Sequence, residues 1–267
     1  MTDETPALLA RRCRPPTGPA AVTVLFTGGA GIRPGLGREL YGAFPAFRAA
    51  YDTVRGALDH WLRLPLAAVV FAPEGGVDAA LIRRSEFGQP ALFAFHVAVF
   101  RLWQSWGLRV GAVSGHGAGE IAAAHVADAL NLADAARLVT ARGRLAPVHP
   151  AVLAGDFAAT LDSEAAFARA AADSAVAPPR IPLVCATTGR SMGPGSAPGR
   201  QPLSPGYLLS EARRMSHTAD AVRTLVRAGF PRPYPCGPDP ADTRPGRELR
   251  AVLGVAGRMR ALGREPG

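Results

Sequence analysis

The chain has 267 residues, 48% of them apolar and 19% charged, which excludes a disordered protein and a small scaffold held together by disulfides. Its 30 glycines and 25 prolines, 55 of 267 residues, lack the repeat of collagen, so we expect them in loops and tails. No apolar run reaches the ~18 residues that a membrane-spanning helix needs, and no secretion leader is recognisable. The sequence therefore predicts a soluble cytoplasmic protein without membrane contact.

The formal net charge is +9, and all 30 basic residues are arginine. Arginine favours acidic partners through bidentate contacts, and a small acidic carrier protein would suit such a surface. The arginines are scattered and are not interleaved with exposed aromatic residues, which argues against nucleic-acid binding. A solvated face without any partner is an equally good interpretation.

Metal and nucleotide sites are not expected. The three cysteines lie far apart without a CxxC spacing, which predicts free thiols and neither a disulfide framework nor a zinc site. His60, His96 and His217 have no second ligand three or four residues away. The glycine cluster at 28–31 lacks the G-x-G-x-x-G spacing and a Walker lysine, so we expect no dinucleotide or nucleoside triphosphate.

Residues 1–20 are polar and rich in proline and arginine, which predicts a flexible arm before one domain over residues 21–267. The apolar run at 21–26 ends at the glycine cluster and is typical of a buried strand followed by a tight loop. From Leu40, apolar residues recur at helical spacing and predict a helix. Its buried face would hold Phe44, Phe47, Tyr51, Val54 and Leu58.

Strands and helices alternate along the rest of the chain. The elements expected in order are a buried helix at 89–106, a strand at 109–114, helices at 120–130 and 132–145, a strand at 181–186, and helices near 204–215, 218–228 and 246–262. This alternation implies an α/β fold with a parallel sheet and helices on both faces.

At the junction between the strand at 109–114 and the next helix, residues 115–119 read GHGAG and have the frame of a nucleophile elbow, G-x-S-x-G. The nucleophile position is Gly117. We expect the next residue, Ala118, to belong to the same catalytic site. A glycine relieves the backbone strain of such a turn, so we expect the turn to form without its nucleophile. Ser114 and Cys185 lie in strands, where we interpret them as a packed hydroxyl and an inert core thiol.

Four motifs follow one another along the chain. They are residues 26–40 (FTGGAGIRPGLGREL), 89–94 (QPALFA), 115–127 (GHGAGEIAAAHVA) and 134–142 (DAARLVTAR). In this order they resemble the acyltransferase domains of modular polyketide synthases and the malonyl-CoA:acyl-carrier-protein transacylases. Residues 180–189 and 219–222 are similar to a later strand and helix of the same family.

The resemblance implies a protein that takes an acyl group such as malonyl from coenzyme A onto a serine and passes it to a carrier-protein thiol. By the same resemblance the serine corresponds to Gly117 and the glutamine of the family's GQG loop to Gly29, so both side chains are absent. Three other positions are retained: Gln89, His116 and Arg142, whose guanidinium would meet an acyl carboxylate.

The resemblance also places a ferredoxin-like subdomain between the arginine and the catalytic histidine. The best candidate for that histidine is His149, and only residues 143–148 separate it from Arg142, too few for a hairpin with its strands. We therefore expect this small subdomain to be deleted. Its loss would leave an exposed face, which a second copy of the chain could cover in a homodimer.

The function expected from the sequence is that of a catalytically silent acyltransferase-like protein of polyketide or fatty-acid-type biosynthesis. It would bind an acyl carrier protein, a polyketide synthase component or an acyl ligand, with a coenzyme A or carrier-protein thioester as its ligand and no other cofactor. One alternative is an active acyltransferase or hydrolase in which His149 or His116 acts as base without a covalent intermediate. Another is a decayed gene product with no selected role.

Overall fold

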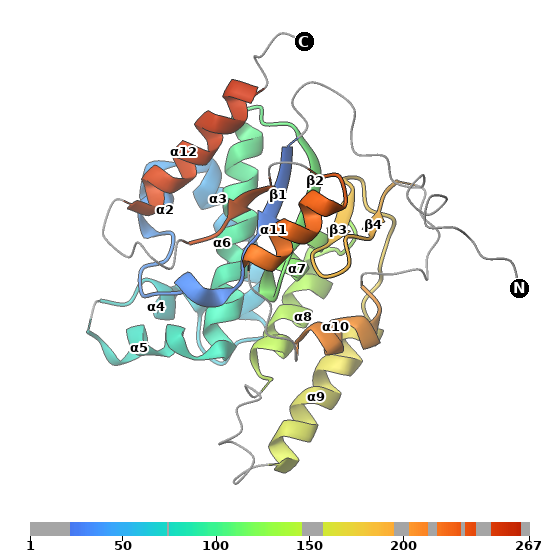
Figure 1. Cartoon of the computed structure of the whole chain (residues 1–267). Helices are drawn as coiled ribbons and strands as arrows, with labels where there is room; N and C mark the ends of the chain where they lie inside the picture. Colours follow the sequence, from blue (N-terminus) through green and yellow to red (C-terminus); the bar gives the residue numbers. More distant parts are fainter. Residues whose placement is uncertain are drawn as a thin grey trace, which may run out of the picture.

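A five-stranded sheet with the strand order β4-β3-β2-β1-β5 lies at the centre of the molecule (Figure 1). The computed structural model describes residues 22–73, 75–145, 157–194, 203–212, 218–230, 233–238 and 247–262. The strands are β1 (Val22–Phe26), β2 (Val110–Gly115), β3 (Leu183–Cys185), β4 (Ser191–Met192) and β5 (Pro233–Cys236). Only β4 runs antiparallel to its neighbour, so the expected parallel sheet is confirmed. All described strands belong to this sheet, and the described residues contain no second, ferredoxin-like sheet.

The register brings the ends of the parallel strands together. Phe26, the last residue of β1, lies opposite Gly115 of β2 and Cys236 of β5, and Gly115 lies opposite Cys185 of β3. The carboxyl ends of these four strands therefore meet at one edge of the sheet. In open α/β sheets this edge is where ligands bind.

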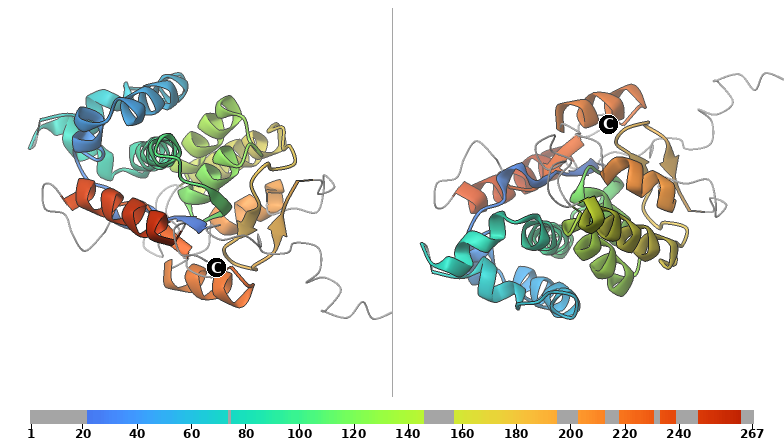
Figure 2. Two further views of the ribbon diagram at one scale, coloured as in Figure 1. Left: turned by 90° about the horizontal axis from the view of Figure 1, so that it is seen from above. Right: turned by 90° about the horizontal axis from the view of Figure 1, so that it is seen from below.

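Helices cover both faces of the sheet, as expected (Figure 2). They are α2 (Arg38–Ala43), α3 (Pro45–Asp59), α4 (Leu66–Val70), α5 (Val77–Ala80), α6 (Ser85–Ser105), α7 (Ala118–Val126), α8 (Leu132–Gly143), α9 (Phe157–Ala172), α10 (Pro205–Ala212), α11 (Thr218–Arg227) and α12 (Arg247–Leu262), with 3₁₀ turns η1 (Gly29–Gly31) and η2 (Leu81–Arg83). Because side chains alternate along a strand, Val24 and Phe26 pack in the large core with α6, while Leu25 packs with Leu225 of α11 on the opposite face.

The helix predicted from Leu40 is two helices, because the chain is extended at Phe44 (φ −125°, ψ 112°) and α3 begins at Pro45. Proline disfavours helical backbone at the preceding residue but suits the first position of a helix. The expected apolar face is otherwise correct, since Phe47, Tyr51, Val54 and Leu58 are buried, while Phe44 is only partly buried.

Strand β5 was not anticipated, because two of its four residues are proline, which is typical of turns. It pairs with β1 only, at the edge of the sheet. Pro233 and Pro235 are alternate residues, so both nitrogens without hydrogen point to the same, unpaired side. The sequence analysis also did not anticipate β4 or α9, and it placed the start of α6 at Gln89 where the helix begins at Ser85.

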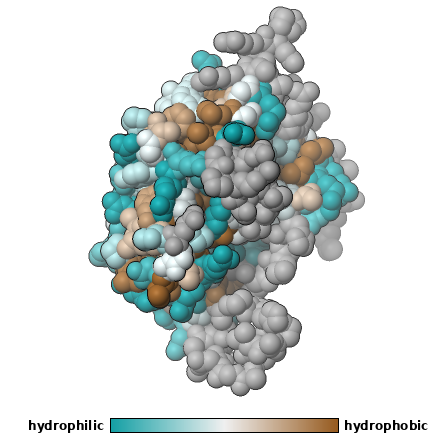
Figure 3. All heavy atoms as spheres, turned by 90° about the vertical axis from the view of Figure 1, so that its left-hand side faces the viewer, coloured by the Kyte–Doolittle hydropathy of each residue, from teal (hydrophilic) through white to brown (hydrophobic). Residues whose placement is uncertain are grey.

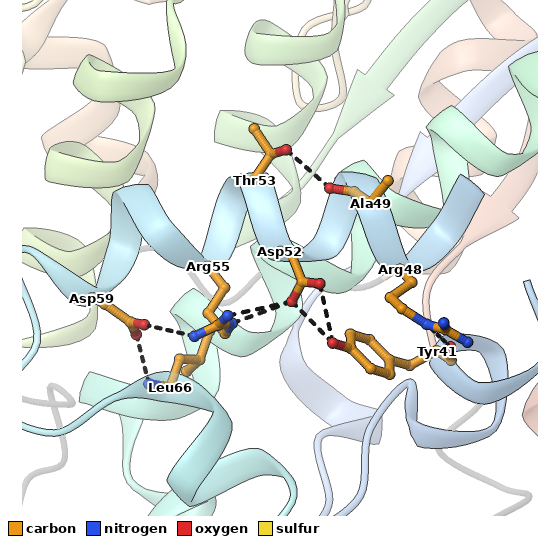
Figure 4. A network of polar contacts seen from close by, with 8 residues as sticks. All are labelled: Tyr41, Arg48, Ala49, Asp52, Thr53, Arg55, Asp59 and Leu66. Atoms are coloured by element: carbon orange, nitrogen blue, oxygen red, sulfur yellow. Dashed lines mark hydrogen bonds and ion pairs between the residues drawn. The ribbon is translucent and has the colours of Figure 1, made fainter. Parts of the chain in front are cut away.

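A polar network fixes α3 against its neighbours (Figure 4). Asp52 accepts hydrogen bonds from the Tyr41 hydroxyl of α2 at 3.0 and 3.1 Å and pairs with Arg55 at 3.4 Å. Arg55 also pairs with Asp59, which accepts from the backbone N–H of Leu66 at the start of α4. Partly exposed ion pairs of this kind contribute little stability each, so their main effect is to set the positions of these helices.

Large exposed apolar side chains are few in the described part of the chain: Trp61, Val77, Val226 and Leu253, which lie in four different segments. On the side that faces left in Figure 1, hydrophobic residues form separate patches between hydrophilic ones (Figure 3). Within the described ranges, none of the helices combines the length and apolarity that crossing a membrane requires.

Candidate functional site

The loop from β2 to α7 forms a sharp elbow at the carboxyl edge of the sheet. Gly115 ends β2, and Gly117, with φ 62° and ψ −131°, caps the N-terminus of α7. A Cβ at Gly115 would lie 2.1 Å from the carbonyl oxygen of Gly119, and a Cβ at Gly119 would lie 2.3 Å from that of Phe26. Both positions therefore require glycine, because β1, β2 and α7 approach one another through their backbones.

The apex of the elbow is different. A Cβ at Gly117 would meet nothing closer than the Arg142 guanidinium at 3.8 Å and the Cα of Gly28 at 3.9 Å. A side chain has room there, although an L-residue at this positive φ is strained. The site thus keeps the backbone of a nucleophile elbow and the space for a nucleophile, without a hydroxyl or thiol at its apex.

A cleft of about 500 Å³ opens at the elbow. Its walls are the loop after β1, the turn before α6, the first turns of α6, the elbow, and the end of α8. Six of the seven predicted site residues line it: Gly29, Gln89, His116, Gly117, Ala118 and Arg142. The seventh, His149, lies outside the described residues.

Arg142 supplies a buried positive charge to the cleft, which the exposed Arg83 also lines. Its Nη1 donates to Oε1 of Gln89 at 2.5 Å, and Gln89 in turn donates to the Ser85 hydroxyl at 2.7 Å. Burial lowers the pKa of Arg142, while Glu120 and Glu211 act in the opposite direction. A guanidinium stays protonated in proteins, so the cleft holds a fixed cation that suits a carboxylate.

His116 links the elbow to two distant segments. Its Nε2 accepts from the backbone N–H of Gly28 at 3.2 Å and lies 3.0 Å from the Thr218 hydroxyl at the start of α11. Because Nε2 accepts a hydrogen bond from Gly28, it carries no proton, and the Thr218 hydroxyl donates to it as well. The Nε2 lone pair therefore serves to hold the loop after β1 and α11 against the elbow.

A buried polar cluster lies behind the elbow. The Tyr207 hydroxyl of α10 donates to Glu120 of α7, and the thiol of Cys185 lies 3.0 Å from the Tyr207 oxygen. Burial raises the pKa of Glu120 to about 8; the nearby Glu211 adds to this rise, while the Tyr207 hydrogen bond and Arg142 oppose it. Burial therefore favours the protonated form of Glu120, which lies in the first turn of α7.

The two other candidates for a nucleophile do not reach the cleft lining. Ser114 is fully buried and donates to the carbonyl oxygen of Val184 at 2.8 Å, as a packed hydroxyl does. Cys185 is buried, and its thiol forms a hydrogen bond with the Tyr207 hydroxyl. In the described ranges, His, Cys, Asp and Glu form no group of three or more that could hold a metal ion.

Sequence analysis missed Thr218, Tyr207 and Glu211. They lie on α10 and α11, about 90 residues after the elbow, and belong to no motif that marks them. The main signal was the polarity of Glu120 among the buried residues of α7, since a buried carboxyl requires a partner.

Comparisons with known proteins agree with this geometry. Residues 23–191 match the family described as acyl transferase domain. The polyketide synthase GfsA of Streptomyces halstedii is 52% identical over 127 residues, which cover 48% of this chain and only 2% of that synthase. The chain thus corresponds to a small part of this relative's length.

Solved structures show the same fold. The acyltransferase domain from the second module of the salinomycin polyketide synthase superposes with a TM-score of 0.69 and 28% identity, over 90% of this chain and 73% of that domain. A malonyl-CoA:acyl carrier protein transacylase of Xanthomonas oryzae gives a TM-score of 0.63 and 22% identity over 91% of this chain and 92% of its own, which supports the fold alone. This chain is therefore a member of the acyl transferase domain family that occurs in polyketide synthases.

Proposed function

We propose that this chain binds acyl thioesters or their carriers in a polyketide-type pathway without transferring the acyl group itself. The observation that carries the proposal is Gly117, which occupies the apex of a formed elbow beside an open cleft and offers no atom for an ester. Removing the nucleophile of a serine hydrolase lowers kcat by ~10⁶-fold. Gly29, where the resemblance expects a glutamine, removes a second polar side chain from the same cleft.

Retention of a binding site is supported by Arg142 and Gln89. The Xanthomonas relative is a malonyl-CoA:acyl carrier protein transacylase, and the free carboxylate of a malonyl group is the kind of anion that a buried guanidinium recognises. Arg142 is already oriented by Gln89, so little side-chain freedom is lost on binding. The proposed ligand class is therefore a thioester whose acyl group ends in a carboxylate.

An alternative mechanism with His116 as general base is disfavoured by its contacts. The Nε2 atom that would take a proton already accepts from Gly28 and contacts Thr218. A general base must reach the proton that it removes, and this nitrogen is turned toward the protein.

Intact-mass measurement after incubation with malonyl-CoA tests the absence of transfer. We expect the mass of the chain to stay unchanged, because the apex of the elbow carries no hydroxyl or thiol. An adduct of malonyl mass on the unsubstituted chain would refute the proposal.

Thermal unfolding in the presence of malonyl-CoA tests binding. A ligand that binds only the native state stabilises it by ~2.7 kcal/mol at a hundred times its Kd, which corresponds to a Tm rise of several degrees. Arg142→Ala should abolish this rise. Arg190→Ala removes the same charge from an exposed turn and should leave it intact. An equal rise in Arg142→Ala would show that the ligand does not use this cleft.

A further inference from the structure

A second cavity, of about 610 Å³, lies on the other side of the loop that follows β1. Val99 and Trp103 of α6 and Val252 and Val255 of α12 form its apolar walls, and residues at the end of β5 complete it. Gly28, Gly29 and His116 line both this cavity and the cleft at the elbow. The size lies within the ~300–1,000 Å³ of small-molecule sites in proteins.

Two arginines lie at the rim of this cavity, where α12 faces solvent. Arg250 and Arg258 are exposed and line the cavity, and neither side chain has a hydrogen bond or ion pair among the described residues. They are eight residues apart on one helix, about 12 Å along its axis. Glu248 lies on the same helix, but it pairs with Arg33 at 3.1 Å. Its charge is therefore already balanced and does not neutralise Arg250 and Arg258.

The polar groups at the inner end of the cavity are satisfied within the protein. The Thr218 hydroxyl donates to Nε2 of His116, and the Thr27 hydroxyl donates to the carbonyl oxygen of Cys236 at 3.4 Å. Buried polar groups that already have partners gain little from a ligand. A polar group of the ligand therefore belongs at the arginines and its apolar part at the inner walls.

We propose that this cavity binds an aliphatic carboxylate of medium chain length, with the carboxylate at Arg250 and Arg258 and the chain against Trp103, Val252 and Val255. The cavity excludes water from the chain, and the arginines supply charge-assisted hydrogen bonds to the head. The residues proposed to contact the ligand do not line the elbow cleft, and the proposal does not depend on the function proposed above. Since both cavities share the loop at Gly28 and Gly29, a bound chain contacts the loop that borders the elbow.

Calorimetric titration of the full chain with octanoate, decanoate and dodecanoate, each below its micellar concentration, tests the site. We expect saturable binding whose Kd falls about three- to fourfold for each added methylene. Dodecyltrimethylammonium, which has the same chain and the opposite charge, should bind at least tenfold more weakly than dodecanoate. Equal affinity for all three carboxylates, or for the cationic compound, would overturn the proposal.

Variants locate the site. Arg250→Ala combined with Arg258→Ala should weaken decanoate binding at least tenfold, while Arg190→Ala should not change it. Ala251→Trp places an indole in the cavity from an exposed position and should abolish binding with the circular dichroism spectrum unchanged. Arg142→Ala should bind decanoate as the unsubstituted chain does. Loss of binding in Arg142→Ala, or its retention in the double arginine variant, would place the carboxylate elsewhere and refute the assignment.

Discussion

The frame of the elbow and its apex obey different constraints. At Gly115 and Gly119 an added Cβ would lie 2.1 and 2.3 Å from backbone atoms, whereas at Gly117 the nearest atom is 3.8 Å away. The frame is therefore imposed by the packing of β1, β2 and α7. The apex is open, and its residue is constrained only by backbone conformation.

This difference explains how the fold can persist without the nucleophile. The turn depends on close backbone approach, and a serine at the apex adds nothing to that packing. Glycine at the apex offers no hydroxyl for an ester and also avoids the strain of a side chain at φ 62°. Stability and acyl-transfer chemistry are thus assigned to different residues of the same five-residue loop.

The largest effect is expected from a methyl group in the frame. Gly119→Ala places Cβ against the carbonyl oxygen of Phe26 and should cost at least ~4 kcal/mol, a large part of the total stability of a domain. Urea unfolding measures it. Gly56→Ala is the matched control, since nothing lies within 4 Å of its Cβ, and in the middle of α3 it should raise stability by ~0.5–1 kcal/mol. Similar stabilities of the two variants would show that the frame is not tightly packed.

The second prediction concerns pH and the polar cluster behind the frame. The pKa of Glu120 is raised by burial to about 8, above its value of 4.5 in an unfolded chain. Its contribution to stability is therefore complete below pH 4.5 and is lost as pH rises through 8, because the unfolded chain ionises first. Between pH 4.5 and 8 the free energy of unfolding should therefore fall by ~2–4 kcal/mol.

Urea unfolding at several pH values between 5 and 8.5 tests this, with Glu120→Gln as the variant. Glutamine keeps an acceptor for the Tyr207 hydroxyl and does not ionise, so its stability should change less with pH than that of the unsubstituted chain. Asp78→Asn, at an exposed site, should leave the pH dependence unaltered. Parallel curves for Glu120→Gln and the unsubstituted chain would mean that Glu120 is ionised in the native state.

The third prediction places a hydroxyl at the apex. Gly117→Ser should fold, because the Cβ has room, but should lose ~1–3 kcal/mol from the positive φ. We expect no malonyl adduct by mass, because Nε2 of His116 is occupied and Gly29 has no side chain to assist. An adduct would show that the serine finds a base, and that a single substitution separates this chain from self-acylation.

Much of the fold could be predicted because its signals are local. The run at 22–26, the long apolar helix α6 and the elbow each carry their pattern within a few residues. Strand β5 could not be predicted, since its prolines indicate turns and only the free edge beside β1 makes them acceptable. The break at Phe44 was missed because the apolar spacing continues through it.

The site divides in the same way. Gly117, His116 and Arg142 were recognisable because they stand in motifs, and the structure brings them to one cleft. The partners of the buried groups were not recognisable. Tyr207 and Thr218 reach Glu120 and His116 only through tertiary packing, and no spacing in the sequence links them.

At neutral pH the smallest effect is expected at His96 of α6. It is fully buried against the ring of Phe26, and neither ring nitrogen has a partner among the described residues. An unsatisfied buried polar group is costly, so His96→Leu should raise the free energy of unfolding by ~1 kcal/mol at pH 7.

Burial lowers the pKa of His96 to about 3, so the unfolded chain takes up a proton below pH 6.5 while the native chain does not. The histidine's contribution therefore falls with falling pH, and at pH 5 the advantage of His96→Leu should grow to ~3 kcal/mol. His60→Leu, at an exposed position, should show neither effect, and a pH-independent difference for His96→Leu would mean that this histidine takes up a proton as readily in the core as in the unfolded chain.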